Sequence, residues 1–165
     1  MNNLSIFTYT NSMKKIDIKD LAIDVLIPVA SGTIIGIVFK DYTSSIEQFE
    51  RNIIVPPIVF PIVWSILYVL IGVWYYFFGL EANNKQKILY YALLGINLLF
   101  TPSLFYFKNI PVSLIITFVL LIGNLYLFVW SIRKDKKGFL LLPYLVWLLF
   151  ANILIIDLFI NNILV

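Results

Sequence analysis

Residues 57–78 read PIVFPIVWSILYVLIGVWYYFF and contain no charged side chain. At a rise of about 1.5 Å per residue, an α-helix of this length crosses the roughly 30 Å of hydrocarbon in a bilayer. Pro57 can open such a helix because the N–H that proline lacks would have no partner in the first turn. The stretch therefore predicts a membrane-spanning helix that begins at Pro57 and ends before Gly79.

Further apolar runs of similar length lie on both sides of this stretch, separated by short polar breaks. We predict an all-α membrane protein, a bundle of five transmembrane helices that forms one domain over residues 21–160. The predicted spans are residues 21–39, 57–78, 88–107, 111–132 and 139–160. A polar tail is predicted at residues 1–20 and a short tail at residues 161–165. A cleaved signal peptide is the alternative for the first run, but apolar residues resume at Ile34 and complete a span.

The composition agrees with a membrane protein and narrows the chemistry. Of 165 residues, 61% are hydrophobic and 13% charged, whereas soluble domains are about 45–50% apolar and 25% charged. The basic residues lie in the polar breaks, so the net charge of +3 predicts membrane topology and no nucleic-acid partner. The chain has no cysteine and no histidine, which excludes thiolate nucleophiles, Ser-His-Asp triads and zinc sites. We expect no metal site and no obligatory cofactor.

Lysine and arginine are distributed unevenly between the two ends of the predicted bundle. The N-terminal side carries Lys14, Lys15, Lys19, Lys85, Lys87, Arg133, Lys134, Lys136 and Lys137. The opposite side carries Lys40, Arg51 and Lys108. Cytoplasmic loops of membrane proteins are enriched in these residues. We therefore predict a multi-pass protein of the cell membrane with a cytoplasmic N-terminus and an external C-terminus.

The first break, residues 40–55, is long for a connection inside a compact domain. Ser44-Ser45-Ile46-Glu47 has the sequence of a helix capping box, and Ile46, Phe49 and Ile53 would then share one helical face. We predict a short amphipathic helix over the external ends of the bundle. It serves either as a lid over a cavity or as a plain connector.

The middles of the predicted spans carry amides rather than charges, namely Asn97, Asn124 and Asn152. Asp24 and Asp157 lie nearer the span ends. Pumps and secondary transporters carry ionisable side chains near the midplane, so no proton relay is predicted. An amide in an apolar span needs a hydrogen-bond partner, which the bundle interior or a ligand can supply.

Gly32 and Gly36 form a Gly-x-x-x-Gly in the first span. This spacing lets two helix backbones approach closely where lipid offers no hydrophobic drive. The close approach can serve packing inside the bundle or dimerisation. In either case we expect replacement of Gly32 or Gly36 by leucine to disturb helix packing.

Three motifs resemble those of the TspO/MBR family, the tryptophan-rich sensory proteins and translocator proteins. The second span contains Pro56-Pro57 and then Phe60-Pro61-x-x-Trp64-x-x-Leu67-Tyr68-x-x-x-Gly72, similar to the second helix of that family. The fifth contains Pro143-Tyr144-Leu145-x-Trp147-x-x-Phe150-Ala151-x-x-Leu154, similar to its last helix. The third contains Asn97-x-x-Phe100-Thr101-Pro102, where the family has Asn-x-x-Trp-Ser-Pro. The first loop departs from the family, because residues 45–55 lack its Trp, Tyr and Pro residues.

The resemblance implies a cavity between helices that binds tetrapyrroles such as protoporphyrin or haem, and it implies a homodimer. The ligand-binding residues it implies are Trp64, Tyr68, Asn97, Phe100, Thr101, Trp147, Phe150, Ala151 and Leu154. Some relatives are linked to light-dependent porphyrin breakdown. Trp64 and Trp147 match their tryptophan pair and are the candidate catalytic residues. We rank catalysis below binding or sensing.

Helical spacing independently groups part of this set. Residues four apart share one helix face, as Trp64 and Tyr68 do, and as Trp147 and Ala151 do. We expect Trp64, Trp147, Asn97 and Ala151 to face one cavity, where stacking and dispersion hold a flat macrocycle without metal ligation. Two other functions stay open: a small permease or transport accessory for an apolar solute, and an assembly protein whose cavity is filled by its own Phe and Leu side chains.

Overall fold

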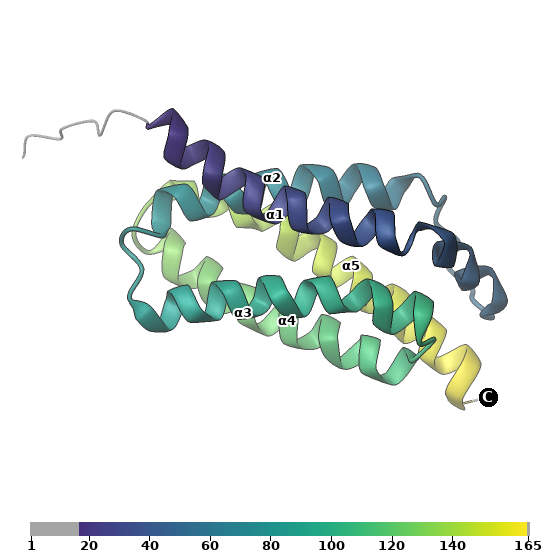
Figure 1. Ribbon diagram of the computed structural model, residues 1–165. Coiled ribbons are helices and arrows are strands. Elements are labelled where there is room, and N and C mark those ends of the chain that lie inside the picture. Colours follow the sequence, from purple (N-terminus) through teal and green to yellow (C-terminus); the bar gives the residue numbers. More distant parts are fainter. Residues whose placement is uncertain (1–16, 165) are drawn as a thin grey trace, which may run out of the picture.

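Five α-helices run through the structure, a computed structural model that describes residues 17–164 (Figure 1). They are α1 (Ile18–Val38), α2 (Val59–Phe78), α3 (Asn84–Thr101), α4 (Ile110–Ile132) and α5 (Leu142–Phe159). Four short helices complete the chain: the 3₁₀-helices η1 (Lys40–Gln48) and η3 (Lys136–Leu141), and the π-helices η2 (Pro102–Tyr106) and η4 (Ile160–Leu164). All five long segments are apolar enough to cross a membrane, and the described residues contain no strand. The predicted five-helix bundle is confirmed.

The helix ends follow from capping side chains. α1 begins inside the segment predicted as a polar tail, because the Asp17 carboxylate accepts the backbone N–H of Lys19 at 2.9 Å. The rest of that tail, residues 1–16, lies outside the described residues. α3 begins four residues before the predicted span, since Asn83 and Gln86 form a reciprocal capping box. At the other end the chain stays helical to Leu164, where we expected a tail.

The turn between α3 and α4 is built by Pro102, Lys108 and Asn109. The α-helix changes to a π-helix at Pro102. Lys108 adopts a positive φ of 52°, which reverses the chain direction. The Asn109 side chain then accepts the backbone N–H of Val112 at 3.0 Å and caps α4.

The helices form two neighbouring pairs with α5 between them (Figure 1). α1 packs along α2, and α4 contacts both α3 and α5. Buried apolar side chains of α2 to α5 form the main core, including Leu67, Trp74, Leu120 and Leu148. In α1 only Pro28 is buried, so α1 lies at the edge of the bundle.

Two ends of the bundle can be distinguished. The loop end carries η1, the α3–α4 turn and η4, and the basic end carries the α2–α3 turn and η3 (Figure 1). At the basic end, the Lys134 ammonium lies 4.8 Å from the Trp130 ring centre and 3.4 Å from a Glu81 carboxylate oxygen. A lysine beside an aromatic ring is typical of the membrane–water interface.

Two of the three amides inside the spans have structural roles. Asn152 of α5 accepts the Thr117 hydroxyl of α4 at 3.0 Å and donates to two backbone carbonyls, those of Thr117 and Leu148. Asn124 donates to the Leu120 carbonyl of its own helix at 2.8 Å. Both amides find partners inside the bundle, as buried polar groups in an apolar medium require.

The two glycines of the Gly-x-x-x-Gly have different surroundings. A Cβ added at Gly32 would overlap the Tyr68 ring of α2, so this glycine serves packing inside the bundle. A Cβ added at Gly36 would meet nothing within 4 Å. The expectation that both glycines hold a helix contact is therefore wrong for Gly36. The backbones of α1 and α2 approach closely at Gly72 instead, where an added Cβ would come within 2.6 Å of the Asp24 carbonyl oxygen.

Candidate ligand-binding cavity

A cavity of about 650 Å³ lies at the loop end between α1, α2, α3 and α5. This volume falls within the roughly 300–1,000 Å³ of sites that bind small molecules. Apolar and aromatic side chains make up most of its wall. The four charged side chains on it, Lys40, Glu47, Arg51 and Asp157, come from the first loop and from the end of α5.

The aromatic wall comes from one face of α2. Phe60, Trp64 and Tyr68 follow one another at four-residue intervals and all line the cavity. The ring centres of Trp64 and Tyr68 are 5.4 Å apart. The face predicted from their spacing therefore points into the cavity.

Trp147 of α5 lies behind this wall. Its ring packs edge-on against Trp64 at 6.4 Å and against Phe60 at 6.0 Å between centres. Phe150 packs on Trp147 at 5.5 Å. Trp147, Phe150 and Ala151 are not among the lining residues, and α5 instead presents Leu154, Asp157 and Leu158 to the cavity.

Asn97 of α3 is the buried polar group of the wall, with 4% of its surface exposed. Its side-chain N–H donates to the Tyr68 hydroxyl at 3.1 Å. Its side-chain oxygen, Oδ1, has no hydrogen-bond partner among the described residues. The indole N–H of Trp147 has none there either. A buried polar atom without a hydrogen-bond partner is costly unless water, an ion or a ligand supplies one.

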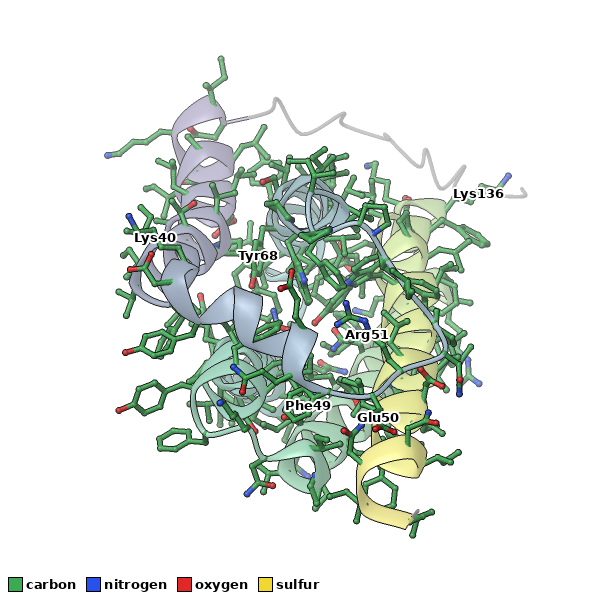
Figure 2. All side chains as sticks on the ribbon, turned by 90° about the vertical axis from the view of Figure 1, so that its right-hand side faces the viewer. Lys40, Phe49, Glu50, Arg51, Tyr68 and Lys136 are labelled. Carbon is green, nitrogen blue, oxygen red and sulfur yellow. The ribbon has the colours of Figure 1, made fainter. Side chains whose placement is uncertain are left out.

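The first loop covers the mouth of the cavity (Figure 2). η1 crosses the loop end, and the segment after it contributes Arg51, Ile53 and Val55 to the wall. Of the two roles considered for this loop, the structure thus favours the lid over the plain connector.

The helix in this loop differs from the predicted one. It begins at Lys40, ahead of the predicted start, and ends at Gln48, so Phe49 and Ile53 follow it instead of lying on its face. The side chain of Ile46 lies outside the described residues. A helix start at Lys40 follows from continuing α1 through a single turn residue, Phe39.

The end of α5 holds this loop in place. The Asp157 carboxylate accepts the backbone N–H groups of Asn52 at 2.9 Å and Ile53 at 3.1 Å, and also the Asn52 side-chain amide at 3.1 Å. Asn162 exchanges two hydrogen bonds with the backbone of Glu50, at 3.0 and 2.7 Å. We call Asp157 and Asn162 the latch.

A second contact holds the other part of the loop, where the Lys108 ammonium donates to the Gln48 side-chain oxygen at 2.6 Å. Sequence reasoning missed the latch because Asp157 was interpreted as a span-end residue. The signal was its neighbourhood: Asp157, Asn161 and Asn162 gather three polar side chains at the end of an otherwise apolar helix.

The structure brings most of the predicted ligand-binding residues to one place. Those that line the cavity are Trp64, Tyr68, Asn97, Phe100, Thr101 and Leu154. The prediction lacked the lining residues of α1 and of the first loop, and several on the other helices, such as Phe60, Leu98 and Leu158. Whether the predicted set binds a ligand stays a prediction.

Comparison with known proteins adds an independent observation. Residues 24–160 match the profile of the TspO/MBR family. The chain belongs to the TspO/MBR family. A relative from Archaeoglobus fulgidus, named tryptophan-rich protein TspO, is 31% identical over 117 residues, which cover 68% of this chain and 76% of that protein. Within the TspO/MBR match lie the first loop, α2 to α5 and the whole wall of the cavity.

Proposed function

We propose that the protein binds a tetrapyrrole, such as protoporphyrin or haem, or a similar flat apolar molecule in this cavity, in a sensory or transport-related role. The observation that carries the proposal is the open cavity, walled by Phe60, Trp64 and Tyr68 and covered by a latched loop. Membership of the TspO/MBR family supports the tetrapyrrole class.

The wall suits such a ligand. Stacking on an aromatic ring contributes about 0.5–1.5 kcal/mol beyond the area buried. The apolar surface from α1, α2 and α3 would take the ring system. The charged side chains Lys40 and Arg51 lie on the mouth side, where the carboxylates of a protoporphyrin would stay near water. Binding of this kind needs no bond to a metal ion.

The open volume also bears on the alternatives. An assembly protein would fill this space with its own Phe and Leu side chains, and about 650 Å³ is left unfilled. A permease could use the same cavity. Uptake of protoporphyrin IX into proteoliposomes distinguishes the two roles, because a binding protein gives saturable binding without accumulation inside the vesicle.

The direct test is an absorbance titration of the purified protein in detergent with protoporphyrin IX. We expect a shifted porphyrin absorption band that saturates at one ligand per chain. Detergent micelles alone serve as the control for partition of the porphyrin. A band shift that rises without saturation, or that equals the shift in empty micelles, would contradict the proposal.

A further inference from the structure

The turn between α4 and α5, at the basic end, gathers positive charge that the protein does not neutralise. Residues 133–137 read Arg-Lys-Asp-Lys-Lys, and all five are exposed. Among the described residues, only Lys134 of these cations forms an ion pair, with Glu81 at 3.4 Å. The Asp135 carboxylate accepts the backbone N–H of Lys137 at 2.7 Å. The cations left without an ion-pair partner there are Arg133, Lys136 and Lys137.

The backbone of this turn is fixed on the end of α4. Gly138 lies so close to that helix that an added Cβ would be 2.6 Å from the backbone nitrogen of Ile132. The Ser131 carbonyl accepts the backbone N–H groups of Lys134 and Asp135, both at 3.0 Å. The basic side chains therefore extend from a rigid support, which lowers the entropy lost when they bind an anion.

Two of the lysines lie against aromatic rings at the edge of the apolar surface. The Lys137 ammonium is 4.4 Å from the centre of the Phe77 ring of α2, and the Lys134 ammonium is 4.8 Å from that of Trp130. The Lys136 side chain projects away from the bundle (Figure 2). Lysine stems that follow apolar surface keep their ammonium groups at the boundary between hydrocarbon and water. We therefore expect these cations at the level of the lipid phosphates.

An exposed apolar surface continues directly from the basic residues. Phe139 follows them in the chain and is 53% exposed, with its ring edge-on to Phe128 of α4 at 5.8 Å between centres. Leu142 and Val146 continue the same side of the chain along α5 and are exposed as well. A ligand that contacts both surfaces needs an anionic group joined to a long apolar part.

We propose that residues 133–139, the headgroup site, bind an anionic glycerophospholipid. Its phosphate lies beside the basic side chains and an acyl chain lies along Phe139, Leu142 and Val146. A soluble polyanion would leave the apolar surface uncovered, and a zwitterionic lipid would bring a cation of its own to the lysines. Four or more Lys and Arg residues next to a transmembrane helix are typical of sites for anionic lipids. The headgroup site lies at the opposite end from the cavity mouth, so the inference does not rest on the proposed function.

The test compares two lipids that differ only in the headgroup, dioleoyl phosphatidylglycerol and dioleoyl phosphatidylcholine. Native mass spectrometry of the purified protein in detergent resolves each lipid-bound species and gives both dissociation constants. We expect phosphatidylglycerol to bind roughly 5- to 30-fold more tightly, since each Lys or Arg near the headgroups supports a factor of about 5. The protein is already folded in this measurement, so the preference does not depend on how basic residues act during membrane insertion.

Three variants connect the preference to the headgroup site. Lys136→Gln/Lys137→Gln should bring the ratio of the two affinities close to one. Lys19→Gln/Lys85→Gln is the matched control and should leave the ratio unchanged, because it removes the same charge from exposed lysines of α1 and α3 at the same end of the bundle. Phe139→Ala should weaken the binding of both lipids by a similar factor, since both have the same acyl chains.

Each outcome bears on the inference. A ratio of one in the unsubstituted protein would overturn it and leave the basic residues with a role in topology alone. Equal losses in the two double variants would also overturn it, because the preference would then come from the net charge of the whole end. Inorganic phosphate, exchanged for acetate at constant ionic strength, should not displace phosphatidylglycerol. Complete displacement would indicate a site for free anions and would overturn the lipid assignment.

Discussion

Trp64 belongs both to the wall of the cavity and to the aromatic packing behind it. One side of its ring lines the cavity, and it also packs against Tyr68, Tyr144 and Trp147 at 5.4, 6.1 and 6.4 Å between ring centres. Trp147 has a supporting position, because it packs against the residues that form the wall. The two tryptophans matched to the family pair therefore have different positions relative to a ligand.

This difference predicts unequal effects on binding. Trp64→Phe should lower the affinity for protoporphyrin IX several-fold, since a lost aromatic contact costs about 0.5–1.5 kcal/mol. Trp147→Phe should lower it less. Trp130→Phe, at the basic end, is the control and should change nothing. Absorbance titration is the suitable measurement, because it does not depend on tryptophan emission. Equal losses for Trp64→Phe and Trp130→Phe would place the ligand outside this cavity.

Asp157 determines how firmly the first loop, residues 40–55, is held against the end of α5. Its carboxylate accepts three hydrogen bonds from Asn52 and Ile53, two of them from backbone N–H groups, so these amides exchange only when the loop opens. Asp157→Ala should therefore speed hydrogen exchange of the amides at residues 50–53 by roughly 10- to 100-fold. Mass spectrometry of peptides from the loop measures the change.

The control for the latch is Asp135→Ala. Asp135 accepts the backbone N–H of Lys137 at 2.7 Å and caps η3 at the opposite end of the bundle. Its removal should leave exchange at residues 50–53 unaltered. If Asp157→Ala also left that exchange unaltered, the loop would be held by contacts other than the latch.

At the scale of the element, α1 shows how one motif can have two roles. Gly32 allows the Tyr68 ring to pack against the α1 backbone, whereas Gly36, one turn later, opens onto the cavity. At Gly36, α1 therefore leaves space in the cavity that a larger side chain would fill.

Replacement by leucine should therefore have different effects at Gly32 and at Gly36. Gly32→Leu should destabilise the protein by about 1–3 kcal/mol, the usual cost of overpacking. Gly36→Leu should leave stability unchanged or slightly raised, since leucine is the better helix former, but its side chain should enter the cavity and weaken porphyrin binding. Thermal unfolding in detergent and the porphyrin titration test both. A stable Gly32→Leu variant, or full binding by Gly36→Leu, would contradict the assignment.

At the scale of the whole molecule, the surface is arranged for lipid. Large apolar side chains on the outer faces are exposed, such as Ile115, Ile122 and Ile153, which a bilayer rather than water would cover. Charged residues gather at the two ends, with Lys85, Lys134 and Lys137 at the basic end. The bundle therefore has the form of a membrane domain with two distinct aqueous faces.

The distribution of basic residues predicts which face is which. Reporters fused after Lys85 and after Arg133 should read cytoplasmic, and a reporter inserted in residues 40–55 should read external, because Lys and Arg are retained on the cytoplasmic side. The cavity mouth would then face the outside of the cell membrane. Paired phosphatase and fluorescent-protein fusions measure the orientation. Reversed signals at all three positions would place the mouth in the cytoplasm.

The helices and the faces within each helix could be derived from the sequence alone. Span length and apolar composition predict five crossings because the bilayer thickness and the helix rise are constants. Spacing placed Trp64 beside Tyr68 because residues four apart in an α-helix are always neighbours. Such properties depend only on local geometry, which every α-helix shares.

The rotation of one helix against another depends on tertiary packing. Trp147 and Leu154 share a face of α5 by spacing, yet only Leu154 lines the cavity, since Phe60 and Trp64 of α2 pack against the indole. The latch at Asp157, the unpaired oxygen of Asn97 and the open space at Gly36 arise in the same way. Each results from contacts between segments far apart in the chain, and these contacts depend on how all the helices fill space together.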